Sequence, residues 1–365
     1  MTKAEPKYKQ LKRELLTQMQ NGRRKPGDML PSEFELADQF GMSRQTVRQA
    51  MGELVQEGLL RRVQGKGTFV TETRTTATDL QTIGIVTTSI SDYIFPLIVR
   101  GAEATLREKG YRLLLSSTDN DKDRERECLE MMMSHPLKGL IIEPTKSAGG
   151  NPNLAYYLDL DQRAIPYLMI NERYGELQCP VVKMEDELGG FLAADHLLKL
   201  GHRRIAGFFK TDDLQGLNRL KGFIRAHREN RAELPSRQVI QYTTEEKAEK
   251  PFAAALAMLK GADRPTAFVC YNDELAVKLL EAARRLRLSV PEDLSVVGFD
   301  DASLATATEV KLTTIAHPKL EMGVYAAKQL MAMIEQGGAS SSVDMVYEPI
   351  WVERHSTCPP PAEAM

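Results

Sequence analysis

The feature that most constrains the fold is an alternation of two patterns that runs from Ile83 to Ile334. Short runs rich in Val, Ile, Leu and Phe alternate with longer stretches whose apolar side chains recur at helical spacing. This alternation predicts parallel sheets with helices packed on both faces. The segment is long enough for two such sheets, so we expect an α/β domain of two lobes. The predicted strands are 83–87, 112–116, 139–142, 166–170, 181–184, 205–209, 239–241, 267–270 and 295–298, and the predicted helices are 97–109, 124–134, 188–200, 217–229, 252–259, 274–286 and 320–334.

The first 70 residues have a different pattern, in which three amphipathic helices precede a hairpin. Ser32 and Glu35 have the spacing of a capping box, in which the serine side chain caps the helix and the glutamate reaches back to it. That helix is expected to end at Gly41, and the next one begins after Ser43. Two helices joined by so short a turn predict a helix-turn-helix.

A glycine-rich tip, Gln64-Gly65-Lys66-Gly67, lies between the two strands of the predicted hairpin. Its glycines allow the backbone to approach a groove wall closely, and the basic side chains nearby can contact phosphates. The first turn of the third helix carries polar side chains of the kind that read base edges in the major groove. A polar helix face alone is as often merely solvated, but the capped helix, the turn and the basic hairpin together predict DNA binding. The expected DNA-binding residues are Ser32, Ser43, Arg44, Gln45, Thr46, Arg48, Arg61, Arg62, Lys66 and Gly67.

The formal net charge of −2 hides an uneven distribution of charge along the chain. Residues 1–70 contain 13 Lys and Arg against 8 Asp and Glu, whereas the remainder contains 35 against 42. We therefore expect only the N-terminal part to meet a polyanion. The polar N-terminus and the absence of a long apolar run predict a cytoplasmic protein that makes no membrane contact. The four cysteines lie far apart and have no histidine at ligand spacing, which predicts reduced thiols, no metal and no other cofactor.

The sequence does not fit two other classes of protein, an enzyme and a transport binding protein. No dinucleotide fingerprint, P-loop, G-x-S-x-G or H-E-x-x-H motif is present in the sequence, so we expect no enzyme. A transport binding protein would need a signal peptide and would have no use for residues 7–70.

Polar residues follow most of the predicted strands. In open α/β sheets, ligands bind beyond the carboxyl ends of the strands, so these residues are candidates for a ligand site. Their side chains supply the paired donors and acceptors that sugar hydroxyls need, and Tyr93, Phe95 and Phe299 are expected to stack on a sugar ring. Each residue taken singly could equally be a strand-end cap or a loop ion pair. Ser91 and Asp92 belong to the same set, and the expected ligand-binding residues are Tyr93, Phe95, Glu143, Lys146, Asn171, Arg173, Asp213, Gln215, Arg219, Asn272, Asp300 and His317.

Both parts of the chain resemble known families. Residues 7–70, with the string PSEFELADQFGMSRQTVRQAMGELVQEGLLRRVQGKGTFV, are similar to the winged helix of the GntR family. That resemblance implies dimers on near-palindromic operators. Residues 82–355 resemble the effector domain of LacI-type repressors and the periplasmic ribose-binding proteins, which makes Arg219, Asn272 and Asp300 the first candidates for ligand contacts. The segments that carry this second resemblance are 200–205, 219–223, 272–274, 290–293, 297–301 and 312–315.

The chain departs from the LacI-type pattern between its two parts. LacI-type repressors carry a short hinge helix there that inserts into the minor groove. Residues 71–81 are rich in Thr and have no apolar period, so we expect a linker in its place. We therefore expect no hinge helix that inserts into the minor groove.

The sequence thus predicts three segments: a winged helix-turn-helix at 1–70, a linker at 71–81, and a two-lobed sugar-binding and dimerisation domain at 82–356. We expect a homodimeric transcriptional repressor that binds double-stranded operator DNA and is released by a small sugar. L-Arabinose is the first expectation for that sugar. The alternatives are another pentose or hexose as inducer, or a purine as corepressor.

Overall fold

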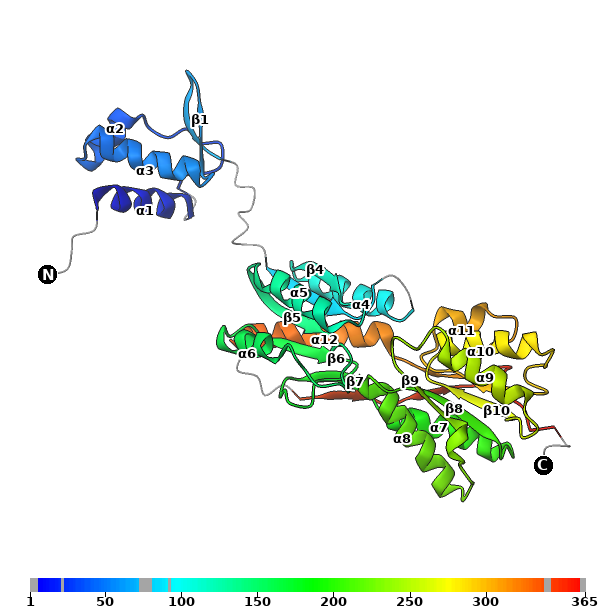
Figure 1. Cartoon of the computed structure of the whole chain (residues 1–365). Coiled ribbons are helices and arrows are strands. Elements are labelled where there is room, and N and C mark those ends of the chain that lie inside the picture. The colour runs from blue at the N-terminus through cyan, green and yellow to red at the C-terminus, as the bar shows by residue number, and fades with distance from the viewer. Residues whose placement is uncertain (1–5, 21–22, 72–80, 91–92, 338–342, 362–365) are drawn as a thin grey trace. The chain divides into compact units, whose positions relative to one another are not determined.

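The computed structural model describes residues 6–20, 23–71, 81–90, 93–337 and 343–361. The chain divides into two compact units, residues 1–80 and 81–365 (Figure 1). Most of the predicted linker, and also Ser91 and Asp92, lie outside the described residues. Within the described ranges, no helix has both the length and the apolar character needed to cross a membrane.

The N-terminal unit packs three helices against a two-stranded hairpin. The helices are α1 (Lys7–Gln20), α2 (Glu33–Phe40) and α3 (Arg44–Gln56), and β1 (Leu60–Val63) pairs antiparallel with β2 (Gly67–Val70). The predicted capping box is present, since Ser32 Oγ accepts the Glu35 N–H at 3.2 Å and the Glu35 carboxylate accepts the Ser32 N–H at 2.8 Å. Gly41 ends α2 with φ of 58°, a left-handed conformation that glycine adopts without steric cost. The buried core of this unit is formed by Leu11, Leu15, Leu30, Leu36, Ala37, Val47, Ala50, Met51, Leu54, Leu60 and Val70.

The first lobe of the second unit is a six-stranded parallel sheet with helices on both faces. The strand order is β13-β7-β6-β5-β3-β4. One apolar cluster packs α4 and α12 against the sheet, and a second cluster packs α5 and α6 against it. The strands are β3 (Thr82–Thr87), β4 (Arg112–Ser117), β5 (Leu137–Ile142), β6 (Tyr167–Ile170), β7 (Val181–Met184) and β13 (Met345–Tyr347), and the helices are α4 (Phe95–Glu108), α5 (Lys122–Met133), α6 (Leu154–Gln162) and α12 (Lys319–Glu335).

The second lobe repeats this arrangement around a smaller parallel sheet, with strand order β11-β10-β8-β9. Apolar clusters again lie on both faces, one beneath α7 and α8 and the other beneath α9 and α10. The strands are β8 (Ile205–Lys210), β9 (Val239–Tyr242), β10 (Ala267–Cys270) and β11 (Ser295–Val297), and the helices are α7 (Asp186–Lys199), α8 (Leu214–Glu229), α9 (Lys250–Lys260), α10 (Asp273–Arg285), α11 (Ser303–Ala307) and the 3₁₀ turn η1 (Ser236–Gln238).

Helices α7 and α8 approach each other closely because glycines face the partner helix. A Cβ on Gly190 would lie 2.1 Å from the Arg219 carbonyl oxygen, and a Cβ on Gly222 would lie 1.9 Å from the Glu187 carbonyl oxygen. No side chain fits at either position without moving the backbone of its neighbour. The backbone of Arg219 is thus held against α7.

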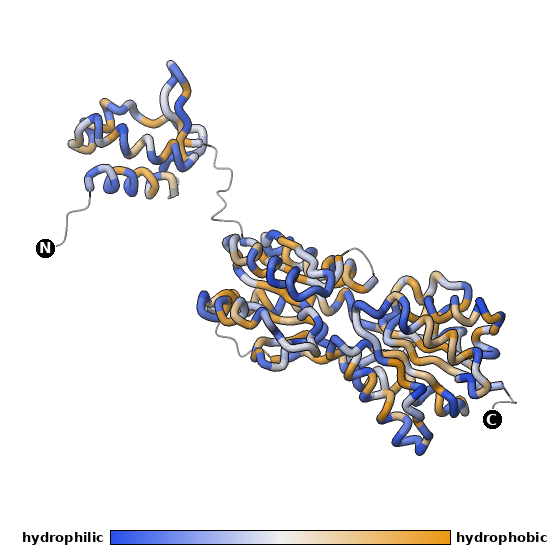
Figure 2. Tube along the Cα trace, in the orientation of Figure 1, coloured by the Kyte–Doolittle hydropathy of each residue, from blue (hydrophilic) through white to orange (hydrophobic). Residues whose placement is uncertain are grey.

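The chain passes between the lobes after β7, before α12 and after β13. Close to these passages, β12 (Thr314–Ala316) pairs antiparallel with β14 (Ile350–Val352). Figure 2 shows apolar strands inside each lobe and polar residues along the outer helix faces. The predicted α/β class with parallel sheets is confirmed, and each predicted strand and helix overlaps an observed one.

Candidate functional site

The exposed end of α3 carries the predicted base-reading side chains. Ser43 caps this helix by accepting the Thr46 N–H at 3.2 Å. Arg44, Gln45 and Arg48 are exposed, whereas Val47 between them is buried in the core. The polar side chains therefore lie on the surface of α3 while Val47 anchors the helix in the core. The predicted hairpin residues Arg61, Arg62, Lys66 and Gly67 are exposed as well, and so is Ser32 at the start of α2.

Glu33, which the sequence analysis did not single out, joins the two predicted DNA-contacting elements. Its carboxylate accepts from Arg48 Nε at 3.0 Å and from Arg62 Nη2 at 3.2 Å. It thereby links α3 to β1 through the first residue of α2. Exposed pairs of this kind contribute little to stability, so their effect is to orient the two arginines.

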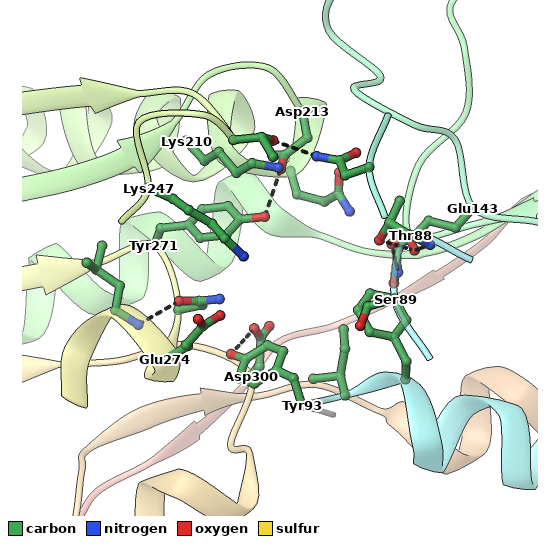
Figure 3. Close-up of a pocket in the computed structure, with 18 of the residues that line it drawn as sticks. Thr88, Ser89, Tyr93, Glu143, Lys210, Asp213, Lys247, Tyr271, Glu274 and Asp300 are labelled. Atoms are coloured by element: carbon green, nitrogen blue, oxygen red, sulfur yellow. Dashed lines mark hydrogen bonds and ion pairs between the residues drawn. The ribbon is translucent and has the colours of Figure 1, made fainter. Parts of the chain in front are cut away.

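A cleft of about 380 Å³ lies at the facing strand ends of the two lobes. Figure 3 shows side chains from both lobes directed into it. Its size is within the range of small-molecule sites in proteins. Ten of the predicted ligand-binding residues line it: Tyr93, Phe95, Glu143, Asn171, Asp213, Gln215, Arg219, Asn272, Asp300 and His317.

The structure does not bring Lys146 and Arg173 to the wall of this cleft. The Lys146 ammonium group forms an ion pair with Glu245 of the other lobe. The Arg173 guanidinium donates to the Cys179 carbonyl oxygen at 3.1 Å and pairs with Asp344 at 2.9 Å. Both residues follow strand ends as expected, but their side chains turn away toward these partners.

Arg219 is at the centre of the polar wall and is only 5% exposed. Its Nε donates to Asp186 at 2.7 Å, its Nη1 donates to the Tyr271 carbonyl oxygen at 2.6 Å, and its Nη2 lies 3.3 Å from Asp300. Burial acts to lower the pKa of the guanidinium, but the two carboxylates outweigh it and raise that pKa. Burial raises the pKa of Asp186 to about 7 despite the opposing effect of Arg219.

Phe299 lies beneath the Arg219 guanidinium, which is 3.6 Å from the centre of the phenyl ring. The ring is 1% exposed, so it supports the arginine from below and is not open to a sugar. The expected stacking role of Phe299 is therefore not available in this structure.

Tyr93 connects the first lobe to the second through its hydroxyl group. That hydroxyl donates to the Asp300 carboxylate and accepts the Asp273 N–H at 3.2 Å. Burial, followed by the nearby Asp300 charge, raises the pKa of the phenol. Tyr93 lines the cleft, but its hydroxyl is already engaged with the opposite lobe.

Glu143, Asn171 and His317 form a connected row of buried polar groups. The Glu143 carboxylate accepts from the Thr88 hydroxyl and the Asn171 amide, each at 2.7 Å. His317 Nε2 lies 3.1 Å from Asn171 Oδ1, so this ring nitrogen donates, while Nδ1 has no partner within the described part of the chain. Burial lowers the pKa of His317 to about 4, so the neutral ring offers Nδ1 as an acceptor.

Other lining residues were not singled out from the sequence. Asp186 begins α7 directly after β7, and Lys210 ends β8, where it pairs with Asp213 at 2.9 Å. The strand-end argument could have found both residues. Lys247 lies on the turn after β9, where no sequence signal marks it. The remaining residues missed include Thr88, Ser89, Asn120, Tyr242, Thr244, Tyr271, Glu274 and Lys278.

The chemistry of the cleft is that of reversible recognition. Carboxylates, amides, hydroxyls and cations alternate around the cavity, which suits a neutral ligand with many hydroxyl groups. The carboxylates are occupied by arginine, lysine, amide or hydroxyl donors rather than by a paired nucleophile and base. Among the described residues, no cluster of His, Cys, Asp and Glu has the composition of a metal site.

Comparison with known proteins defines the class. Residues 7–70 match the family described as bacterial regulatory proteins, gntR family, and residues 194–357 match the periplasmic binding protein-like domain. A DNA-binding regulator domain joined to a solute-binding fold is the architecture of ligand-responsive transcription regulators. Both family resemblances drawn from the sequence are thus confirmed.

Full-length relatives narrow this class. The chain is 61% identical over 355 residues to the arabinose metabolism transcriptional repressor of Geobacillus stearothermophilus, covering 96% of this chain and 98% of the relative. It is 47% identical over 363 residues to the protein of that name from Halalkalibacterium halodurans, covering 97% of each. The chain belongs to the family of these arabinose metabolism transcriptional repressors. Its close relatives are repressors, which are not enzymes.

A solved structure of similar fold carries a sugar. A LacI family transcriptional regulator from Enterococcus faecium with bound ribose matches with a TM-score of 0.65 and 27% identity, over 76% of this chain and 99% of that one. The comparison extends the similarity of the two-lobed unit to a ligand-bound regulator.

Proposed function

We propose that this protein represses transcription by binding operator DNA as a homodimer, and that L-arabinose in the cleft releases it. Binding of a sugar in the cleft is supported by the buried hydrogen-bond donors and acceptors around Arg219, to which both lobes contribute. The names of the relatives and the ribose in a related structure support a pentose.

The N-terminal unit supplies the DNA contacts in this proposal. Helix α3 enters the major groove with Arg44, Gln45 and Arg48 toward base edges, while the hairpin contacts phosphates. A dimer presents two such heads to half-sites about one helical turn, or a multiple of it, apart.

The lobes supply the switch. Glu143 and Asn171 come from the first lobe, whereas Asp213, Arg219 and Asn272 come from the second. A ligand that contacts both sets binds a closed arrangement more tightly than an open one, and it shifts the equilibrium only by that difference. A shift from 1:99 to 99:1 requires about 5.5 kcal/mol, which two occupied subunits can supply jointly. Closure in a dimer then misaligns the two DNA-binding heads.

The test combines calorimetry with a DNA band shift on the full-length protein. L-Arabinose, D-ribose and hypoxanthine are titrated separately, and the same ligands are added to the protein bound to its own promoter fragment. We expect L-arabinose to bind most tightly and to weaken the DNA complex. If hypoxanthine binds tightly and strengthens the DNA complex, the ligand is a purine corepressor and not a sugar inducer.

A further inference from the structure

The cleft is larger than one pentose requires. A cavity of about 150 Å³ accommodates benzene, a ring of six heavy atoms, so the ten heavy atoms of a pentose need on the order of 250 Å³. The cleft measures about 380 Å³. Space therefore remains beside a bound monosaccharide, and the residues around that space indicate what fills it.

Burial divides the polar lining of the cleft into two sets. The first, here named the inner wall, consists of buried residues whose side chains are held by one another, as described above. The second, here named the outer rim, consists of residues that are partly or fully exposed. Among the buried lining residues we define the inner wall as Glu143, Asn171, Asp186, Arg219, Asp300 and His317, and among the partly or fully exposed ones we define the outer rim as Asn120, Thr244, Lys247, Glu274 and Lys278.

The outer rim joins both lobes and offers uncommitted hydrogen-bonding capacity. Asn120 of the first lobe donates to the Thr244 hydroxyl of the second at 2.6 Å. Glu274 and Lys278 face each other at 3.7 Å, too far for a strong hydrogen bond. The Lys247 ammonium group has no hydrogen-bond or ion-pair partner in the described part of the chain, and Figure 3 shows it directed toward the space between the lobes. Lys247 and Glu274 thus place an ammonium group and a carboxylate on the same rim, the donor and acceptor that neighbouring sugar hydroxyls need.

The charge of the lining selects between a second sugar ring and an anionic group. Six carboxylates line the cleft against four lysine and arginine side chains. A phosphate or carboxylate attached to the sugar would meet one net positive charge at the outer rim, from Lys247 and Lys278 against Glu274, inside a cleft whose lining as a whole has an excess of carboxylates. A neutral extension rich in hydroxyls meets the groups that the outer rim provides.

We propose that the outer rim is a second sugar subsite, so that the cleft accepts a disaccharide of pentose units with one ring on the inner wall and the next beside Lys247. This inference rests on the proposed function, because the inner ring occupies the monosaccharide site. A second ring adds hydrogen bonds to Lys247 and Glu274. By the same scale its nine further heavy atoms need on the order of 225 Å³, so the ring takes the space that remains in the cleft and extends past the exposed outer rim.

The test is calorimetric titration of the full-length protein with L-arabinose, with α-1,5-linked L-arabinobiose and with D-ribose 5-phosphate. One added hydrogen bond to a charged group corresponds to at least about tenfold in affinity, so we expect the disaccharide to bind at least that much more tightly than L-arabinose. Lys247→Ala is expected to remove this advantage and to leave L-arabinose affinity within about twofold. Lys250→Ala is the matched control, because Lys250 pairs with Glu246 nearby and does not line the cleft.

Each outcome decides the proposal. Disaccharide binding no tighter than that of L-arabinose, or an equal loss for both sugars in Lys247→Ala, overturns the subsite while the monosaccharide function stands. Tight binding of D-ribose 5-phosphate that depends on Lys247 replaces the sugar subsite by an anion subsite. If L-arabinose does not bind, the proposed function is wrong; disaccharide binding that Lys247→Ala weakens would then still support a sugar site at the outer rim, and absence of disaccharide binding would overturn it.

Discussion

The ammonium group of Lys146, on the loop after β5, contacts the carboxylate of Glu245, on the turn after β9, and so joins the two lobes beside the cleft. Hydrogen bonding to Lys146 lowers the pKa of Glu245 to about 2. Ser147 Oγ accepts the Leu214 N–H at 2.8 Å along the same edge. These contacts join the two walls of the cleft.

Glu245→Gln is expected to weaken sugar binding by up to about fivefold, since an exposed ion pair contributes about 0.2–1 kcal/mol to the closed arrangement. The charge exchange Lys146→Glu with Glu245→Lys should restore the affinity. Glu246→Gln is the control, because Glu246 pairs with Lys250 inside one lobe. Equal effects of Glu245→Gln and Glu246→Gln in calorimetry would contradict a contribution from the contact between the lobes.

Arg219→Lys is expected to reduce sugar affinity by more than about tenfold, because lysine cannot reproduce the forked contacts to Asp186 and Asp300. Arg219→Ala should also lower the free energy of unfolding by about 3–5 kcal/mol, since it leaves buried carboxylates unpaired. Calorimetry measures the first effect, and urea unfolding followed by the fluorescence of Trp351 measures the second. Arg225→Lys, on the same helix but half-exposed, should change neither; a comparable loss there would show that any change in α8 suffices.

Arg44→Ala and Arg48→Ala are each expected to cost about 1–3 kcal/mol in operator binding if the side chain reads a base. Arg237→Ala, in the second unit and paired with Asp263, serves as the control. Affinity is measured by band shift at several salt concentrations. Because Arg61, Arg62 and Lys66 are expected at phosphates, replacing any of them should flatten the salt dependence. If Arg44→Ala or Arg48→Ala leaves operator affinity unchanged, that arginine does not read a base.

Gly190→Ala is expected to destabilise the second unit by about 1–3 kcal/mol, because the added methyl group would press on the Arg219 backbone. The same displacement should weaken sugar binding. Gly175→Ala is the matched control, since a Cβ there meets nothing within 4 Å. Urea unfolding and calorimetry on both variants make the comparison, and equal stability of the two proteins would refute the packing argument.

His317 predicts a pH dependence of stability. In the folded protein the pKa of His317 is lowered to about 4 from its usual value near 6.5. Between pH 4 and pH 6.5 the unfolded chain therefore binds a proton on this side chain more readily than the folded protein does. The free energy of unfolding is therefore unaffected by this proton above pH 6.5, and it decreases by about 1.4 kcal/mol per pH unit as the pH falls from 6.5 toward 4. His317→Asn should reduce this slope when Trp351 fluorescence follows urea unfolding. Identical slopes for the two proteins would exclude His317 as the source.

Much of the cleft could be predicted because the strand-end rule depends only on locating strands. Asn171, Asp213 and Asn272 follow buried apolar runs, and all three line the cavity. The direction of a side chain depends on partners distant in sequence, which the rule does not reach. Arg173 turns away from the cleft because it pairs with Asp344. That partner lies 171 residues further along the chain, so the strand-end rule could not identify it.

The elements that sequence reasoning missed are short or carry weak periodicity. Strands β12, β13 and β14 have three residues each, too few to establish an alternation. Asp186 begins α7 just after the chain crosses between the lobes, and that position places its carboxylate against Arg219. Glu33 pairs with Arg48 and Arg62 because three elements meet at it, a relation that spacing alone does not reveal.

Because β13 is the edge strand beside β7, the sheet of the first lobe is incomplete until residue 347 has been synthesised. The N-terminal unit has its own apolar core, whose residues all lie between Leu11 and Val70. During synthesis on the ribosome, the core of the N-terminal unit is therefore complete long before the sheet of the first lobe can be. A nascent chain interrupted before Met345 would carry the whole core of the N-terminal unit, while the first lobe beside the cleft would still lack its edge strand.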